Sequence, residues 1–148
     1  MFSEITKEKI QVEKINIDKE CQILRMIKAK IKDTFPDDIE IRSIATILHS
    51  FYNGVENIIC LILKGYNEKL PNDLNWHKTI LNNISNKTLQ RDFSITEELK
   101  ENLENYLAFR HFFRHSYGFQ LDWELLSELV NNMELVWENF VNEIKELM

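Results

Sequence analysis

Apolar residues recur every three or four positions along most of the chain, which is the spacing of one face of an α-helix. The first run predicts a helix from about Thr6 to Lys32, ended by the Phe35-Pro36 pair. Its expected core positions are Ile10, Ile17, Cys21, Leu24, Ile27 and Ile31. Four further runs follow this one, so the pattern predicts about five helices in all.

The second run predicts a helix with N-cap candidates Asp37 and Asp38, reaching Lys64 and stopping at Gly65. Its apolar positions are Ile41, Ile44, Leu48, Phe51, Val55, Ile58 and Ile62. Three more widen this face: Ile47, Ile59 and Leu63. So wide a face predicts central packing or a subunit contact. A glycine inside a helix costs about 1 kcal/mol relative to alanine, so Gly54 suggests that another backbone lies close to this position. The neighbour is then either the motif helix or a second subunit. The alternative is that Gly54 has a packing role alone.

A short third helix is predicted from Trp76 to Ile84, and the polar stretch 86–94 after it is expected to be the least ordered part of the chain. The 148 residues include only three Gly and two Pro, so turns are few and helices are long. There is no internal repeat, low-complexity run or linker. We therefore expect an all-α, up-and-down bundle of four to five helices, formed by one domain spanning residues 1–148.

Two capping signals mark the last two helices. Ser94 and Glu97 fit a capping box for the fourth, which is expected to continue to Gly118. Its apolar positions are Leu99, Leu103, Tyr106, Leu107 and Phe113. Asp122 is the N-cap candidate of the fifth helix. The broad apolar face of that helix comprises Leu125, Leu126, Leu129, Met133, Val136, Trp137, Phe140 and Ile144.

Charge is unevenly distributed. The net charge is -6, which argues against a general nucleic-acid coat. Residues 6–32 carry eight basic and four acidic side chains, whereas residues 119–148 carry one and seven. The basic first helix is either a solvated face or a surface for a polyanion. The N-terminus lacks the apolar core of a signal peptide, and no uncharged stretch reaches the roughly 18 residues of a membrane span. With Cys21 and Cys60 expected as free thiols, these features predict a cytoplasmic protein.

The segment from Phe109 to Gly118 concentrates the reactive side chains. Two Arg, two of the four His and one Tyr fall within eight residues, with no acid between Glu104 and Asp122. Imidazole transfers protons near neutral pH, and guanidinium stabilises negative charge on phosphate oxygens. This cluster therefore favours phosphodiester chemistry. Of the other two histidines, His49 is expected to be an ordinary helix residue, and His77 to pack or to cap its helix.

In a regular helix Arg110, Arg114 and Tyr117 share one face, whereas His115 lies about 140° from Arg110. Either the helix loosens before Gly118, or a two-fold axis places two copies of the segment around one cleft. His111 and His115 have the spacing of zinc-binding helices, but the Glu of the metalloprotease motif is absent and an Arg lies beside them, so no metal is expected. Arg and His at a helix C-terminus can also simply stabilise the helix dipole.

Arg110, His115 and Tyr117 resemble the Arg-x4-His-x-Tyr motif of HEPN ribonucleases, and the surrounding YLAFRHFFRHSYGFQLDWELL is similar to the HepT-like toxin branch. Two other segments support this resemblance. Residues 48–57, LHSFYNGVEN, resemble the family's second helix, and residues 76–81, WHKTIL, its short third helix. The resemblance covers most of the chain.

The resemblance implies a homodimeric HEPN bundle whose motif helices line a cleft between the subunits. It implies a toxin acting as a metal-independent endoribonuclease on RNA, without a cofactor. Arg110 would bind the scissile phosphate, and His115 would act as acid or base. Tyr117 would accept AMP from an MntA-like nucleotidyltransferase antitoxin, and the added phosphates would repel RNA from the cleft.

Four residues outside the minimal motif are further candidates. Arg114 is expected to contact phosphate because it shares the Arg110 face, and His111 is a second imidazole. Asn53 and Glu56 either approach the cleft from the second helix or only pack there. The alternative to an enzyme is a non-catalytic HEPN bundle that binds a nucleotide or a partner protein.

Overall fold

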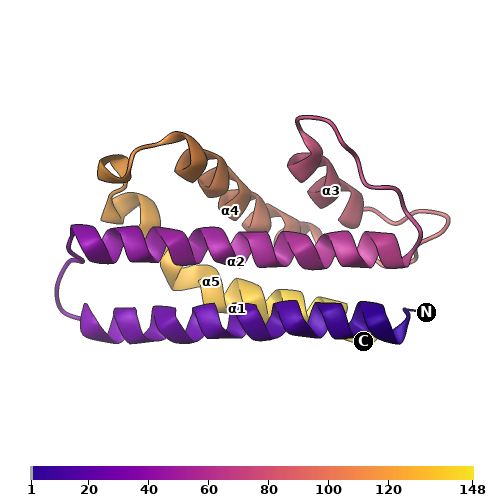
Figure 1. Ribbon diagram of the computed structural model, residues 1–148, viewed down its shortest axis with the longest axis horizontal. Coiled ribbons are helices and arrows are strands. Elements are labelled where there is room, and N and C mark those ends of the chain that lie inside the picture. Colours follow the sequence, from indigo (N-terminus) through magenta and orange to yellow (C-terminus); the bar gives the residue numbers. More distant parts are fainter. Residues whose placement is uncertain (1) are drawn as a thin grey trace.

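The computed structural model describes residues 2–148, and this part of the chain contains helices and no strand. Its α-helices are α1 (Glu4–Lys30), α2 (Asp38–Gly65), α3 (Trp76–Ile84), α4 (Glu97–His115) and α5 (Trp123–Ile144), with short 3-10 helices η1 (Gly118–Gln120) and η2 (Lys145–Leu147). In Figure 1, α1 and α2 form a long antiparallel hairpin, and the two chain termini lie at the same end of the bundle. The predicted all-α bundle is thus confirmed.

The central helix is α2, which contacts α1, α3, α4 and α5. Asp37, one of the two N-cap candidates, is its N-cap, and it also forms a capping box with Glu40 that the sequence analysis did not predict. By length and composition α2 is apolar enough to cross a membrane, but 61% of its most apolar window is buried within the bundle. This is the pattern of a core helix, and it confirms the prediction that α2 packs centrally.

The predicted apolar faces meet in one core. A few of the expected core positions are only partly buried, namely Ile27, Ile41, Leu107, Phe113 and Leu129. Leu125 is 43% exposed, so its assignment to the core was wrong. It lies in the first turn of α5, where Asp122 caps the helix by accepting a 2.8 Å hydrogen bond from the Leu125 N–H. Cys21 is buried, Cys60 is partly buried, and both are free thiols.

The neighbour of Gly54 is α1. A Cβ atom at this position would lie 2.6 Å from Cγ1 of Ile17, which is buried on the facing side of α1. The close approach inferred from the sequence therefore exists, but its partner is a side chain of the first helix. Neither the motif helix nor a second subunit is involved. Gly54 lets α1 and α2 pack closely along the hairpin.

The start of α4 differs from the prediction. Thr96 is the N-cap, and its hydroxyl accepts a 3.2 Å hydrogen bond from the Leu99 N–H, so the Ser94 capping box is wrong. Glu143 of α5 explains the shift, because its carboxylate accepts hydrogen bonds of 2.7 Å from both the N–H and the hydroxyl of Thr96. A contact from a distant part of the sequence thus sets where α4 begins.

The loop 86–94 is built around a buried arginine. Arg91 is 0% exposed and its guanidinium pairs with Glu68, with an Nε to Oε2 distance of 2.6 Å. It also donates hydrogen bonds to three backbone carbonyl oxygens, those of Asn83 (2.8 Å), Asn86 (3.0 Å) and Phe93 (2.6 Å). The expectation that this segment is the least ordered was therefore wrong, since one buried side chain ties both ends of the loop and the end of α3 together.

Candidate functional site

The motif segment leaves its helix earlier than predicted. α4 is helical through His115, and Ser116 is extended, with φ -115° and ψ 157°. Tyr117 consequently lies beyond the helix, so the alternative in which the helix loosens before Gly118 is confirmed. The face that Arg110, Arg114 and Tyr117 would share in a regular helix is therefore not formed, and the stop at Gly118 is wrong. Gly118 instead opens η1.

Gly118 leaves room for a side chain of α2. A Cβ atom at Gly118 would collide with the guanidinium of Arg42, which lies against the turn after α4. Arg42 is held in turn by Asp38, whose Oδ2 accepts a 3.1 Å hydrogen bond from its Nε. The beginning of α2 therefore supports the turn that carries Tyr117.

Arg110 is anchored to the middle of α2. Its Nε donates a 3.1 Å hydrogen bond to Oδ1 of Asn53, and Nδ2 of Asn53 donates one of 3.1 Å to Nε2 of His49. Among the residues that the structure describes, none forms a hydrogen bond with the two terminal nitrogens of Arg110. The guanidinium is thus fixed at one edge, and its outer edge is available for a bidentate contact with a phosphate. The predicted approach of Asn53 to the motif is observed.

His49 serves as the acceptor at the end of this chain of hydrogen bonds. Burial, followed by the positive charges of Arg110 and Arg114, lowers the pKa of His49 below its ordinary value of 6.5. Its ring stacks on Phe113 of α4, with ring centroids 4.8 Å apart. His49 therefore acts as a neutral support of the motif, a role that its sequence context did not reveal.

His115 and His111 form a pair at the end of α4. Nδ1 of His115 donates a 2.8 Å hydrogen bond to the His111 carbonyl oxygen, so the ring nitrogen left unengaged within the described chain is Nε2. The two imidazole centroids are 4.4 Å apart, and both side chains are exposed. On the helix surface, the exposed Arg114 lies on the Arg110 side, whereas His111 and His115 lie together further round α4, about 100° and 140° from Arg110.

A groove of about 420 Å³ separates α3 from α4 beside Arg110 and His111. It is lined by Leu74, Asn75, His77, Lys78, Leu81, Asn82, Glu104, Leu107, Ala108, Arg110 and His111. Arg110 and His111 are the members that the sequence had already singled out, whereas His77 had been assigned a structural role. The groove thus brings an imidazole of the third helix to the motif of the fourth.

Glu56 reaches this groove only through His77. The Glu56 residue is 5% exposed, and both of its carboxylate oxygens lie 2.8 Å from Nδ1 of His77. Because α2 and α3 are separated by a long connection, no local spacing in the sequence signals this pair. The sequence signal closest to this pair was the Trp76-His77 dipeptide at the start of α3, which indicated that His77 packs or caps there.

Tyr117 is largely exposed to solvent. It is 73% exposed, and its ring stacks nearly parallel on Phe119, with centroids 5.7 Å apart and an interplanar angle of 6°. Phe119 is itself 74% exposed. The phenol hydroxyl is therefore open to an incoming enzyme or ligand.

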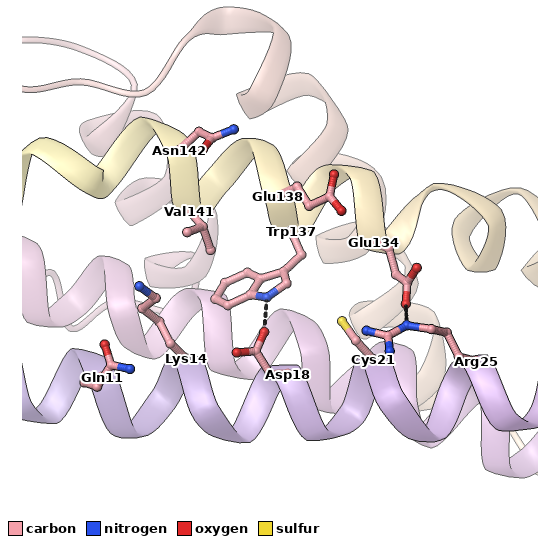
Figure 2. Close-up of a pocket in the computed structure, with 10 residues that line it drawn as sticks. All are labelled: Gln11, Lys14, Asp18, Cys21, Arg25, Glu134, Trp137, Glu138, Val141 and Asn142. Atoms are coloured by element: carbon pink, nitrogen blue, oxygen red, sulfur yellow. Dashed lines mark hydrogen bonds and ion pairs between the residues drawn. The ribbon is translucent and has the colours of Figure 1, made fainter.

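A second cavity, of about 570 Å³, lies between α1 and α5, away from the motif (Figure 2). Four of its lining side chains form two pairs. Nε1 of Trp137 donates a 2.8 Å hydrogen bond to Asp18, and Arg25 pairs with Glu134. None of the motif residues lines this cavity, so the groove between α3 and α4 is the better candidate. Within residues 2–148, no group of three or more His, Cys, Asp or Glu side chains is arranged to hold a metal ion.

The fold and the site together define a helical bundle with an arginine and paired histidines on one exposed helix. A family model described as HepT-like protein matches residues 43–148. The chain therefore belongs to the HepT-like family, and the resemblance seen in the sequence is confirmed. The searches of curated proteins and of solved structures gave no match. The matched region contains α3, α4 and α5 in full and most of α2.

Proposed function

We propose that this protein is a HEPN-type toxin that cleaves cellular RNA as a metal-independent endoribonuclease in the cytoplasm. The observation that carries this proposal is the geometry of Arg110 and His115. Asn53 fixes one edge of the guanidinium and leaves its terminal nitrogens available, and five residues later His115 offers an Nε2 whose tautomer is set by the His111 carbonyl. A phosphate-binding cation and a proton-transfer group thus lie five residues apart on one helix, and pairing of two such helices would bring them to one phosphate.

The chemistry that these groups support is cyclisation of the ribose phosphate. Nε2 of His115 accepts the proton of the 2'-hydroxyl, and the 2'-oxygen attacks phosphorus. Arg110 stabilises the negative charge that develops on the non-bridging oxygens. The bond from phosphorus to the 5'-oxygen breaks and this oxygen takes up a proton from an acid or from solvent, giving a 2',3'-cyclic phosphate and a 5'-hydroxyl. Arg114, exposed one turn after Arg110, contributes a second positive charge for the neighbouring phosphate.

A homodimer is part of the proposal. Phe112 and Phe119 are exposed beside the motif, and exposed aromatic side chains of this kind are enriched at interfaces. Pairing two motif helices about a two-fold axis would cover these rings and double the local positive charge, which an acidic chain needs in order to hold RNA.

Neutralisation by an MntA-like nucleotidyltransferase antitoxin completes the proposal. The exposed Tyr117 hydroxyl would attack the α-phosphate of ATP and release pyrophosphate, leaving AMP on the phenol oxygen. The added phosphate would bring negative charge next to Arg114 and His115, where RNA phosphate has to lie.

The test is a cleavage assay on total cellular RNA in the presence of EDTA. It compares wild type with Arg110→Ala and His115→Ala and records intact mass and dimer size for each preparation. We expect cleavage by wild type alone, with unchanged dimerisation. Absence of cleavage by wild type of unmodified mass would favour a non-catalytic binding bundle, whereas an added AMP-sized mass would identify an already neutralised sample.

A further inference from the structure

A buried carboxylate orients the imidazole that faces the motif groove. Glu56 is 5% exposed, and both of its oxygens lie 2.8 Å from Nδ1 of His77. Nδ1 therefore carries the hydrogen of this contact, which fixes the ring and leaves Nε2 as the nitrogen able to exchange a proton. The adjacent Trp76 packs against the imidazole, with ring centroids 3.7 Å apart.

The burial of Glu56 also bears on the charge of the pair. A carboxylate removed from water requires a partner of opposite charge or several hydrogen-bond donors. Within the described chain its hydrogen bonds go to His77 alone. The Nδ1–H of His77 is the donor that this buried carboxylate uses, and the carboxylate in turn lies where it would stabilise a positive charge on the ring when His77 acts as a proton donor.

The same helix positions both walls of the groove. Asn53 of α2 holds Arg110 on the α4 side, and Glu56, one helical turn further along α2, holds His77 on the α3 side. Arg110 and His77 both line the groove, together with His111. A phosphate bound by Arg110 in this groove would therefore lie beside the imidazoles of His77 and His111, and His115 follows one turn after His111 on α4.

We propose that His77, positioned by Glu56, is the general acid of RNA cleavage, an assignment that rests on the proposed ribonuclease function. As the bond between phosphorus and the 5'-oxygen breaks, Nε2 of His77 gives its proton to that oxygen. His115 takes the proton of the attacking 2'-hydroxyl, so each imidazole exchanges one proton and solvent restores both. His77 is then a catalytic residue and Glu56 a positioning residue.

The test replaces the leaving group. An RNA oligonucleotide that spans a cleavage site mapped with wild type is made in two forms, with the ordinary 5'-oxygen or with sulfur in its place at the scissile bond. A thiolate leaves without a proton. His77→Asn keeps a side-chain N–H for Glu56 but cannot donate a proton to the leaving group. We expect it to lower kcat on the oxygen substrate by about 100-fold or more and to cleave the sulfur substrate within a few-fold of wild type.

Glu56→Gln tests the positioning role. We expect a smaller loss of kcat on the oxygen substrate, little change in KM, and the same rescue by sulfur. Asp18→Asn is the matched control. Asp18 likewise accepts a hydrogen bond from an aromatic ring N–H, that of Trp137, but it lies in the cavity between α1 and α5. We expect it to cleave both substrates as wild type does.

The outcomes separate this inference from the function on which it rests. If wild type cleaves neither oligonucleotide nor cellular RNA, the ribonuclease function and the role of His77 both fail. If wild type cleaves both substrates and His77→Asn either matches it or loses both equally, the ribonuclease stands and the role of His77 is overturned. His77→Gln is measured in parallel, so that an equal loss on both substrates does not depend on one variant.

Discussion

Nε of Arg110 donates a 3.1 Å hydrogen bond to Oδ1 of Asn53, so a side chain in the middle of α2 fixes the direction of the motif arginine in α4. The amide of Asn53 is itself fixed, because its Nδ2 donates to Nε2 of His49. Rotating the amide by half a turn would place its NH2 group against the guanidinium and lose both contacts. Arg110 is thus oriented before any phosphate binds.

Asn53→Ala should therefore reduce RNA cleavage without removing a group that touches RNA. A displaced guanidinium loses its alignment with the phosphate, and misplacement of this kind costs up to about 100-fold in rate. We expect a loss of about 10-fold to 100-fold in kcat/KM, measured on a labelled RNA. Asn57→Ala is the control, because Asn57 lies one turn further along α2 and its amide contacts only Glu13, at 3.4 Å. Equal activity of the two variants would contradict the orienting role of Asn53.

Tyr117→Phe should separate cleavage from neutralisation. Because the Tyr117 ring is 73% exposed and stacks on Phe119, loss of its hydroxyl should leave the turn intact. We expect the variant to stay toxic when the nucleotidyltransferase antitoxin and ATP are present, whereas wild type gains the mass of AMP and loses activity. Peptide mass mapping should place the modification on Tyr117 and leave Tyr106, which is 2% exposed, unmodified. An AMP-sized gain on Tyr117→Phe would refute the assignment.

Arg91→Met should destabilise the fold strongly. The substitution removes a guanidinium that is 0% exposed and leaves the Glu68 carboxylate and several backbone carbonyls without their donor. Breaking a buried pair in this way costs about 3 to 5 kcal/mol. Urea unfolding followed by circular dichroism measures the loss.

Lys87→Ala in the same loop is the control for that experiment. Lys87 makes an ion pair of 3.8 Å with Asp92, and its side chain is 64% exposed. Pairs of this kind contribute about 1 kcal/mol or less, so the variant should unfold close to wild type. A similar, small loss in both variants would mean that the loop is held by its other contacts.

Local patterns were sufficient to predict most helices. The Asp37 cap, the Asp122 cap and the bounds of α3 all follow from residues close together in the sequence. Distant contacts moved the remaining boundaries. Glu143 draws the start of α4 to Thr96, and Arg42 packs on Gly118 beyond the end of α4.

The candidate site also has a part that local sequence predicts and a part that depends on distant contacts. Arg110, His115 and Tyr117 were identified because motif spacing is a local property of the sequence. Their surroundings were only partly foreseen, since the bond from Glu56 to His77 joins two helices whose separation along the chain has no fixed period. A lone polar residue in an apolar helix face, as Glu56 is, does signal a buried partner, but it does not say which one.

The depressed pKa of His49 should make stability depend on pH. Burial, Arg110 and Arg114 hold this pKa below the ordinary 6.5, so the unfolded chain binds a proton at a pH where folded His49 does not. The contribution is fully present above about pH 6.5 and is lost as the pH falls from there towards the folded pKa, because the unfolded state then binds more protons. The free energy of unfolding should accordingly decrease between pH 7 and pH 5.

His49→Gln isolates that contribution. The glutamine can still accept the hydrogen bond from Asn53 but does not titrate, while the other three histidines remain and cancel in the comparison. We expect a shallower fall in the free energy of unfolding for the variant than for wild type over this range, measured by urea unfolding at each pH. Identical slopes would show that folded His49 takes up its proton as readily as the unfolded chain. The neutral acceptor that holds Asn53, and through it Arg110, would then not persist near neutral pH.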